Sequence, residues 1–153
     1  MIKKIVSLNS KSSFEDIVFM SKNSGLLNQY IMLSNPTNKN EKIIKTAFNL
    51  KTHKNHIFIE VKYPLGRRDK RLEIVTRDKN LIKIYKISKL TSADQEALEI
   101  DEILTNIKAK YKNSDKEFYG VLVFEQLPVK SVIESISKIL SNKITFVQNE
   151  LIS

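Results

Sequence analysis

Cysteine is absent from this 153-residue chain, and histidine occurs only twice. Without cysteine there is no disulfide and no thiolate metal site, and two imidazoles argue against zinc. Glycine and proline are scarce, at three residues each. The sequence has no glycine-rich phosphate loop, no nucleophile elbow and no metal-binding His pair. Among metals, a hard cation such as Mg²⁺, held by carboxylates, stays compatible with the composition.

Long apolar runs are also missing. No segment approaches the roughly 18 apolar residues that span a bilayer. The first residues, MIKKIVSLNSK, lack the apolar core and cleavage site of a signal peptide. A hydrophobic fraction of 41% and a charged fraction of 28% are typical of a globular protein. We therefore expect one domain, residues 1–153, in the cytoplasm.

Positive charge is in excess. The formal net charge is +9, which favours an anionic partner: nucleic acid first, then anionic lipid or an acidic protein. Residues 51–90 contain 12 lysines and arginines against four carboxylates, a net +8 of that total. The same stretch is therefore the place to look for contacts with an anion.

Three runs rich in β-branched and aromatic residues lie in this basic stretch, at 57–63, 71–77 and 81–87. Turn-forming pieces separate them at Pro64–Asp69 and Asp78–Asn80. This pattern predicts a three-stranded antiparallel meander.

Helical periodicity surrounds the meander. Residues 2–8 suit a short strand or a helix entry, residues 12–31 are helical in pattern, and 41–51 predict a helix. After the meander, Thr91 or Ser92 caps a helix to residue 112. Its apolar stripe consists of Ala93, Ala97, Ile100, Leu104, Ile107 and Tyr111.

The C-terminal third reads as strand 118–124, a helix starting at Pro128, and strand 143–148. A strand–helix–strand unit implies a parallel pair. The chain is thus predicted to be an α/β (α+β) protein. Its mixed sheet has the meander and two further strands, helices packed on it, a core at 41–150 and a helical N-terminal extension at 1–40.

Two E-x-K patterns suggest metal-dependent phosphodiester chemistry. In the first, Glu60 and Lys62 lie two residues apart, which places both on one face of a regular strand. An ordinary solvated strand face is the simpler explanation of this pattern. The only acid between Asp16 and Glu60 is Glu41, so a second carboxylate would have to come from the helix predicted at 41–51.

The second pattern spans two strands, RLEIVTRDKNLIKIYK. A tight turn at Asp78–Lys79 would place Glu73 opposite Ile84 and diagonal to Lys86. This arrangement resembles the restriction-endonuclease-like (PD-(D/E)xK) superfamily, and the predicted element order over 41–150 is similar to its core. The resemblance implies nuclease activity, with Glu73 as the first acid and Lys86 as the lysine. The second acid is replaced by Ile84.

Some members of that superfamily move the missing acid onto the following helix. By helical geometry Glu96 borders the inward face in the first turn, with Glu99 further round. The resemblance therefore implies Glu73, Lys86 and Glu96 as catalytic residues, and Mg²⁺ held by Glu73 and Glu96. A glutamate that only satisfies the helix N-terminus is the competing interpretation.

The basic side chains of the meander are the candidates for phosphate contact. They are Lys62, Arg67, Arg68, Lys70, Arg71 and Arg77. Tyr63 and Tyr85 suit base stacking or core packing, and His53 and His56 are expected on the surface. The predicted function is nucleic-acid binding, to DNA or RNA, with nuclease activity left open. A non-catalytic inhibitor or immunity-type module that docks an acidic protein is the alternative.

Overall fold

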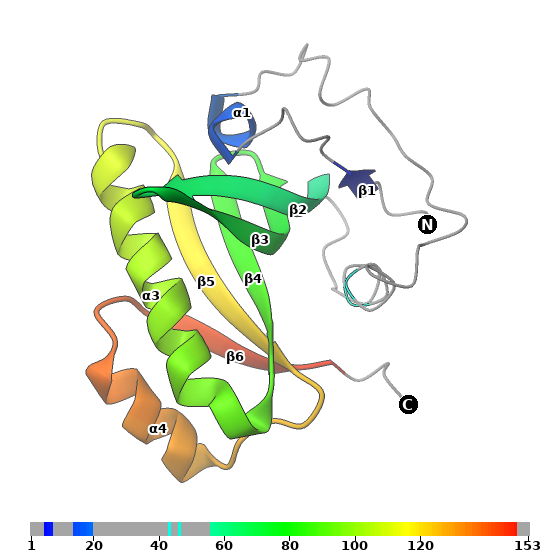
Figure 1. Cartoon of the computed structure of the whole chain (residues 1–153), viewed down its shortest axis with the longest axis vertical. Coiled ribbons are helices and arrows are strands. Elements are labelled where there is room, and N and C mark those ends of the chain that lie inside the picture. Colours follow the sequence, from blue (N-terminus) through cyan, green and yellow to red (C-terminus); the bar gives the residue numbers. More distant parts are fainter. Residues whose placement is uncertain (1–4, 8–13, 20–42, 44–45, 47–55, 150–153) are drawn as a thin grey trace.

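A six-stranded mixed sheet forms the centre of the computed structural model, which describes residues 5–7, 14–19, 43, 46 and 56–149 (Figure 1). Its strands are β1 (Ile5–Ser7), β2 (His56–Leu65), β3 (Arg68–Asp78), β4 (Leu81–Ser88), β5 (Glu117–Phe124) and β6 (Ile144–Gln148), in chain order across the sheet. β2, β3 and β4 are antiparallel neighbours, and the β1–β2, β4–β5 and β5–β6 pairs are parallel. The predicted meander and parallel pair are confirmed. Residues 5–7 form a strand, which is one of the two structures considered for residues 2–8, the other being the start of a helix.

The described helices are α1 (Phe14–Phe19), a short 3₁₀ turn at Leu90–Ser92, α3 (Ala93–Lys110) and α4 (Lys130–Ile139). The mixed α/β fold class is as predicted. No helix in these parts of the chain is long and apolar enough for a membrane span. Ile43 and Thr46 are helical, and the rest of the helix predicted at 41–51 lies outside the described residues.

The main core lies between the sheet and α3. Ala97, Ile100, Leu104 and Ile107 are buried there at the predicted 3.6-residue spacing. Gly120 on β5 permits this close approach, because a β-carbon at that position would come within 2.6 Å of Leu104 Cδ1. The predicted inward face of the long helix is confirmed.

The helix α1 belongs to the same core. Phe14, Ile17 and Val18 are buried, and the Phe14 ring lies 5.5 Å from the ring of Tyr63 and 6.1 Å from that of Tyr111. A second cluster covers the other face of the sheet, formed by Ile57, Ile59, Ile74, Tyr85, Val121 and Val123. Both faces of the central strands are therefore buried.

Asp101 is a buried acid on α3 that the apolar stripe did not predict. Its carboxylate accepts hydrogen bonds from the backbone N–H groups of Ser141 (2.9 Å) and Asn142 (2.8 Å), and from the Asn142 side chain (2.8 Å). Burial alone would raise the pKa of Asp101, but these hydrogen bonds outweigh it and lower the pKa. The carboxylate thereby fastens the connection between α4 and β6 to α3.

This arrangement predicts a pH dependence of stability. A carboxyl whose pKa is depressed by folding stabilises the protein above its unfolded pKa, about 3.9. That contribution is lost as the pH falls through the lower folded-state pKa. Asp101→Asn should cost about 1–3 kcal/mol at pH 7, and the cost should shrink near pH 3. Urea unfolding at the two pH values measures it; an equal cost at both would contradict the role of the charge.

Two buried tyrosines make a matched pair for a second prediction. The Tyr63 hydroxyl donates to Asn106 Oδ1, whereas the buried Tyr111 hydroxyl has no hydrogen-bond partner within the described residues. Burial, with smaller effects of Glu15 and Tyr63, raises the pKa of Tyr111 to about 12. Tyr63→Phe should cost about 1 kcal/mol, and Tyr111→Phe should be neutral or stabilising. Thermal unfolding of both variants measures this difference, and the reverse order would contradict the two assignments.

Candidate nucleic-acid interface

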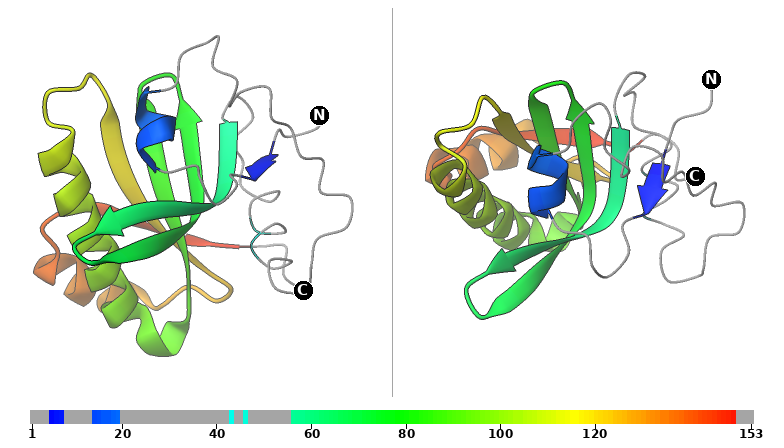
Figure 2. Two further views of the ribbon diagram at one scale, coloured as in Figure 1. Left: turned by 45° about the horizontal axis from the view of Figure 1, so that its top comes forward. Right: turned by 90° about the horizontal axis from the view of Figure 1, so that it is seen from above.

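The outer half of the β2–β3 hairpin leaves the sheet and forms an arm, residues 61–72. β3 pairs with β4 only from Ile74 to Asp78, while β2 and β3 stay paired out to Leu65 and Arg68. The departure occurs at Glu60, whose φ of 53° is unusual for a residue with a side chain. Figures 1 and 2 show the resulting arm crossing over α3.

The inner face of the arm is fastened to α3. Val61, Tyr63 and Leu72 are buried in the main core. Lys70 Nζ lies 3.3 Å from Glu99 Oε1. Glu99 is about two helical turns from Asn106, which accepts the Tyr63 hydroxyl. Because Glu99 and Asn106 are both on α3, the arm is held at two separate points along the helix.

The outer face and tip of the arm carry the exposed cations. Lys62 and Arg71 are cross-strand partners, and therefore lie on the face opposite to Val61 and Leu72. Arg71 Nη1 lies 3.6 Å from Glu60 Oε1, with its side chain 54% exposed. Arg67 and Arg68 are exposed at the tip, where Gly66 takes a φ of 64°, and neither forms an ion pair with another described residue. Five of the six predicted phosphate-binding residues thus share one arm.

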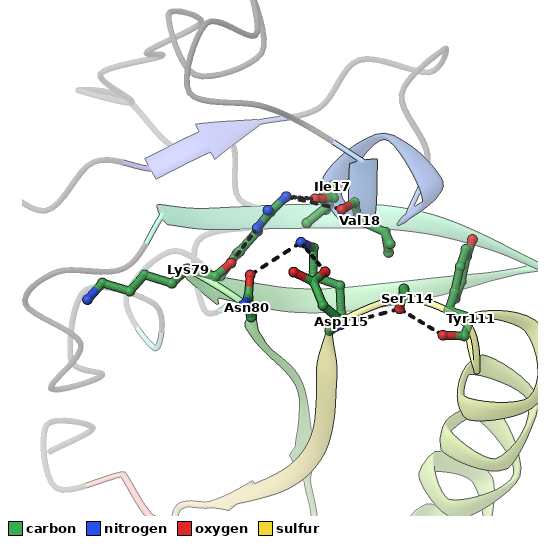
Figure 3. Close-up of polar contacts among 9 residues, drawn as sticks. Ile17, Val18, Lys79, Asn80, Tyr111, Ser114 and Asp115 are labelled. Carbon is green, nitrogen blue, oxygen red and sulfur yellow. Dashed lines mark hydrogen bonds and ion pairs between the residues drawn. The ribbon is translucent and has the colours of Figure 1, made fainter.

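Arg77 is placed elsewhere. Its guanidinium donates to the carbonyls of Ile17 and Val18 at the end of α1, the latter at 3.3 Å, and to the Lys79 carbonyl at 2.9 Å. Figure 3 shows Ile17 and Val18 side by side, and Lys79 apart from them at the other end of these contacts. Burial lowers the pKa of Arg77, and the Asp115 charge opposes this shift. The structure thus uses Arg77 to join α1 to the β3–β4 turn, away from the arm.

The predicted pairing of β3 with β4 was wrong by two residues. The turn lies at Lys79–Asn80, with Lys79 at a φ of 55°, so Val75 and not Glu73 pairs with Ile84. A shift of two keeps the same face, because side chains alternate along a strand. Glu73 lies just beyond the last β3–β4 pair, where its Oε1 accepts the backbone N–H of Ile87 at 3.0 Å. The Glu73 carboxylate thus accepts a hydrogen bond from β4 at the position where the backbone of β3 has left the sheet.

Glu96 is engaged at the end of β4. Its carboxylate accepts from the Ser88 hydroxyl, from the Lys89 backbone N–H at 3.0 Å and from the Ser92 hydroxyl at 3.1 Å. It therefore satisfies donors where the chain enters α3, as in the competing interpretation of this residue. It is not among the residues that surround Glu73.

A small hollow of about 20 Å³ lies between β3, β4 and α3, and Glu73, Lys86 and Glu99 all line it. Lys86 Nζ is 3.5 Å from Glu99 Oε2, so Glu99 forms ion pairs with both Lys86 and Lys70. The acid that meets the predicted lysine is thus Glu99, one turn beyond Glu96. Positions 99, 103, 106 and 110 share one face of α3, and this spacing is the sequence signal that could have pointed to Glu99. The arm covers this face, and the course of the arm was not predicted.

A protein site for Mg²⁺ supplies one or two carboxylates that are free to coordinate, together with waters or phosphates. No group of three or more His, Asp or Glu side chains that could hold a metal occurs in the described parts of the chain. Glu73 accepts a backbone N–H, and Glu99 already faces two ammonium groups. This donor set is satisfied within the protein and does not fit a metal ion as arranged.

Other predicted positions have structural explanations. The left-handed Glu60 interrupts the regular alternation that the Glu60–Lys62 spacing assumed. Tyr63 and Tyr85 are buried, in keeping with core packing, and burial raises the pKa of both. His53 and Glu41 lie outside the described residues, and for His56 only the backbone of β2 is described.

The fold and the arm define a class: a mixed α/β domain that presents a basic two-stranded arm fastened over a helix. Comparisons of the chain with models of known protein families, with curated proteins and with solved structures found no match. The arm is therefore the feature of this protein from which a function is inferred.

Proposed function

We propose that this protein binds nucleic acid through the hairpin arm. The observation that carries the proposal is the set of cations on the arm: Arg67, Arg68 and Arg71 are exposed, Lys62 is half-buried beside Arg71 on the outer face, and Lys70 lies at the inner edge. Guanidinium groups offer planar, paired donors to phosphate oxygens, and the neutralisation of several phosphates releases counterions.

The mounting of the arm supports the same function. Its inner side chains are buried or hydrogen-bonded to α3, so the backbone that carries the cations is ordered before any partner binds. Binding then costs less conformational entropy than it would on a disordered basic tail. A two-stranded ribbon is also an element that nucleic-acid grooves can accept.

The order of the secondary-structure elements also supports the proposal. An antiparallel meander, a helix and a parallel strand follow one another here in the order that the restriction-endonuclease-like superfamily implies. Fold analogy alone assigns no function. Since the acids of the hollow are engaged within the protein, the proposed function is binding without a metal-dependent step.

Ultraviolet cross-linking to a labelled duplex oligonucleotide, followed by peptide mapping, tests the proposal. Cross-links are expected within residues 61–72. Their concentration on α4 and β6 instead would contradict the arm as the binding surface.

Cleavage assays address the nuclease alternative. Incubation of DNA and RNA with the protein and Mg²⁺ or Mn²⁺ is expected to leave both polymers intact. Glu73→Gln keeps an oxygen that can accept the Ile87 N–H, so it separates catalysis from folding. Metal-dependent cleavage that Glu73→Gln and Lys86→Ala each abolish would establish a nuclease in place of a binding protein.

A further inference from the structure

A second basic site lies at the C-terminal end of α3, where the chain turns into β5. It is a pocket of about 290 Å³, and its lining includes Lys108, Lys112, Lys116 and Tyr119, with Glu117 as its one carboxylate. The Lys116 ammonium donates hydrogen bonds to Asp115 Oδ1 at 2.9 Å and to Asn80 Oδ1 at 3.4 Å. Lys108 and Lys112 are both exposed, and Lys108 donates to Asn142.

Tyr119 gives this pocket an exposed aromatic side chain. It is 42% exposed, whereas its strand neighbours Phe118 and Val121 are buried. In the parallel β4–β5 pair, Lys83 is its partner in register, so a cation lies beside the tyrosine on the sheet. The dipole of α3 favours lysines at its C-terminal end and so accounts for these cations. It does not account for the exposed tyrosine near them.

The pocket and the arm are connected by Lys110. Its ammonium lies 5.9 Å from the centre of the Tyr63 ring, on the arm, and 5.5 Å from that of Tyr111, which lines the pocket. The acids of α3 are all in its first ten residues, at positions 94, 96, 99, 101 and 102, and its lysines are in the last turn. A polyanion that contacts the arm is therefore attracted toward the pocket and repelled from the other end of α3.

We propose that this pocket binds a single-stranded segment of the nucleic acid, with one base stacked on Tyr119 and the adjoining phosphates near Lys108 and Lys112. The inference rests on the proposed nucleic-acid function and specifies the form of nucleic acid that the protein takes. An unpaired base exposes its flat face to an aromatic ring, whereas a base inside a duplex is already stacked on its neighbours. The pocket therefore favours single strands over duplexes.

The test uses fluorescence anisotropy with a labelled single-stranded oligonucleotide and the duplex of the same sequence. Tyr119→Leu should weaken single-strand binding about 5- to 150-fold, the effect of losing one stacked base, and leave duplex binding unchanged. Tyr119→Phe keeps the ring and should bind as the unaltered protein does. Lys108→Gln with Lys112→Gln should flatten the salt dependence of single-strand binding, while Lys130→Gln with Lys138→Gln on α4 should not.

The outcomes separate this inference from the proposed function. Single-strand affinity that is unchanged in Tyr119→Leu, but lost when the arm is neutralised, would overturn the stacking site and leave the arm as the binding surface. Equal losses for single strand and duplex would also overturn it. If the unaltered protein binds neither polymer, both proposals fail. Far-ultraviolet circular dichroism of each variant checks that the fold is retained.

Discussion

Replacing Ile100 with aspartate is expected to cost about 3–5 kcal/mol of folding free energy. Ile100 is 2% exposed on the inward face of α3, where its side chain lies against Gly120 on β5. An aspartate there would carry a charge into an apolar core and leave a cavity in place of the removed methyl groups. For a domain with total stability of about 5–15 kcal/mol, this approaches unfolding.

Leu98→Asp provides the matched control for this prediction. It places the same charge on the same helix, two residues away, but Leu98 is 46% exposed. Its cost should stay near 0.5–1 kcal/mol, the range of a lower helix propensity at the surface. Urea unfolding of both variants measures the difference. A loss below about 1 kcal/mol at Ile100 would show that the wrong face of α3 has been placed inward.

Neutralising the arm should have the largest effect on binding. A variant with Arg67, Arg68, Lys70 and Arg71 changed to serine removes up to four phosphate contacts. The slope of log affinity against log salt should then fall by up to about 3.6, at roughly 0.9 per contact for duplex DNA. Binding titrations at one temperature and several salt concentrations measure this slope for the variant and for the unaltered protein.

The control is a second variant with the same net charge as the arm variant. Serine at Lys89, Lys130, Lys138 and Lys143 removes the same number of exposed charges outside the arm. If both variants lose affinity equally, binding depends on net charge alone and not on the arm. Because Lys70 also contacts Glu99, the pair Arg67→Ser and Arg68→Ser should be measured separately, with an expected slope change of about 1.8.

Patterns with a short period predicted most of the fold. The strands and α3 follow from alternation and from 3.6-residue spacing, which report burial within one element. The buried Asp101 escapes that reasoning, because its partners Ser141 and Asn142 are about 40 positions away in the sequence. A buried acid beside an apolar stripe is explained only by tertiary contacts.

The candidate site was less predictable for two local reasons. Moving the turn by one position, to Lys79–Asn80, shifts the pairing of β3 with β4 by two residues. The departure of the arm at the left-handed Glu60 places Lys70 against Glu99, and Glu99 also faces Lys86, where Glu96 was expected. Neither a positive φ at a glutamate nor the path of a hairpin out of its sheet has a sequence signature.

The most direct test of the central claim is the affinity of the unaltered protein for nucleic acid as a function of salt. Labelled single-stranded and duplex oligonucleotides of about 20 nucleotides would be titrated between about 50 and 200 mM KCl. We expect binding at the lowest salt and a log–log slope of about −3 to −4 or steeper, from four or more phosphate contacts. No binding at low salt, or an affinity that does not change with salt, would contradict it and favour an acidic protein as the partner of the arm.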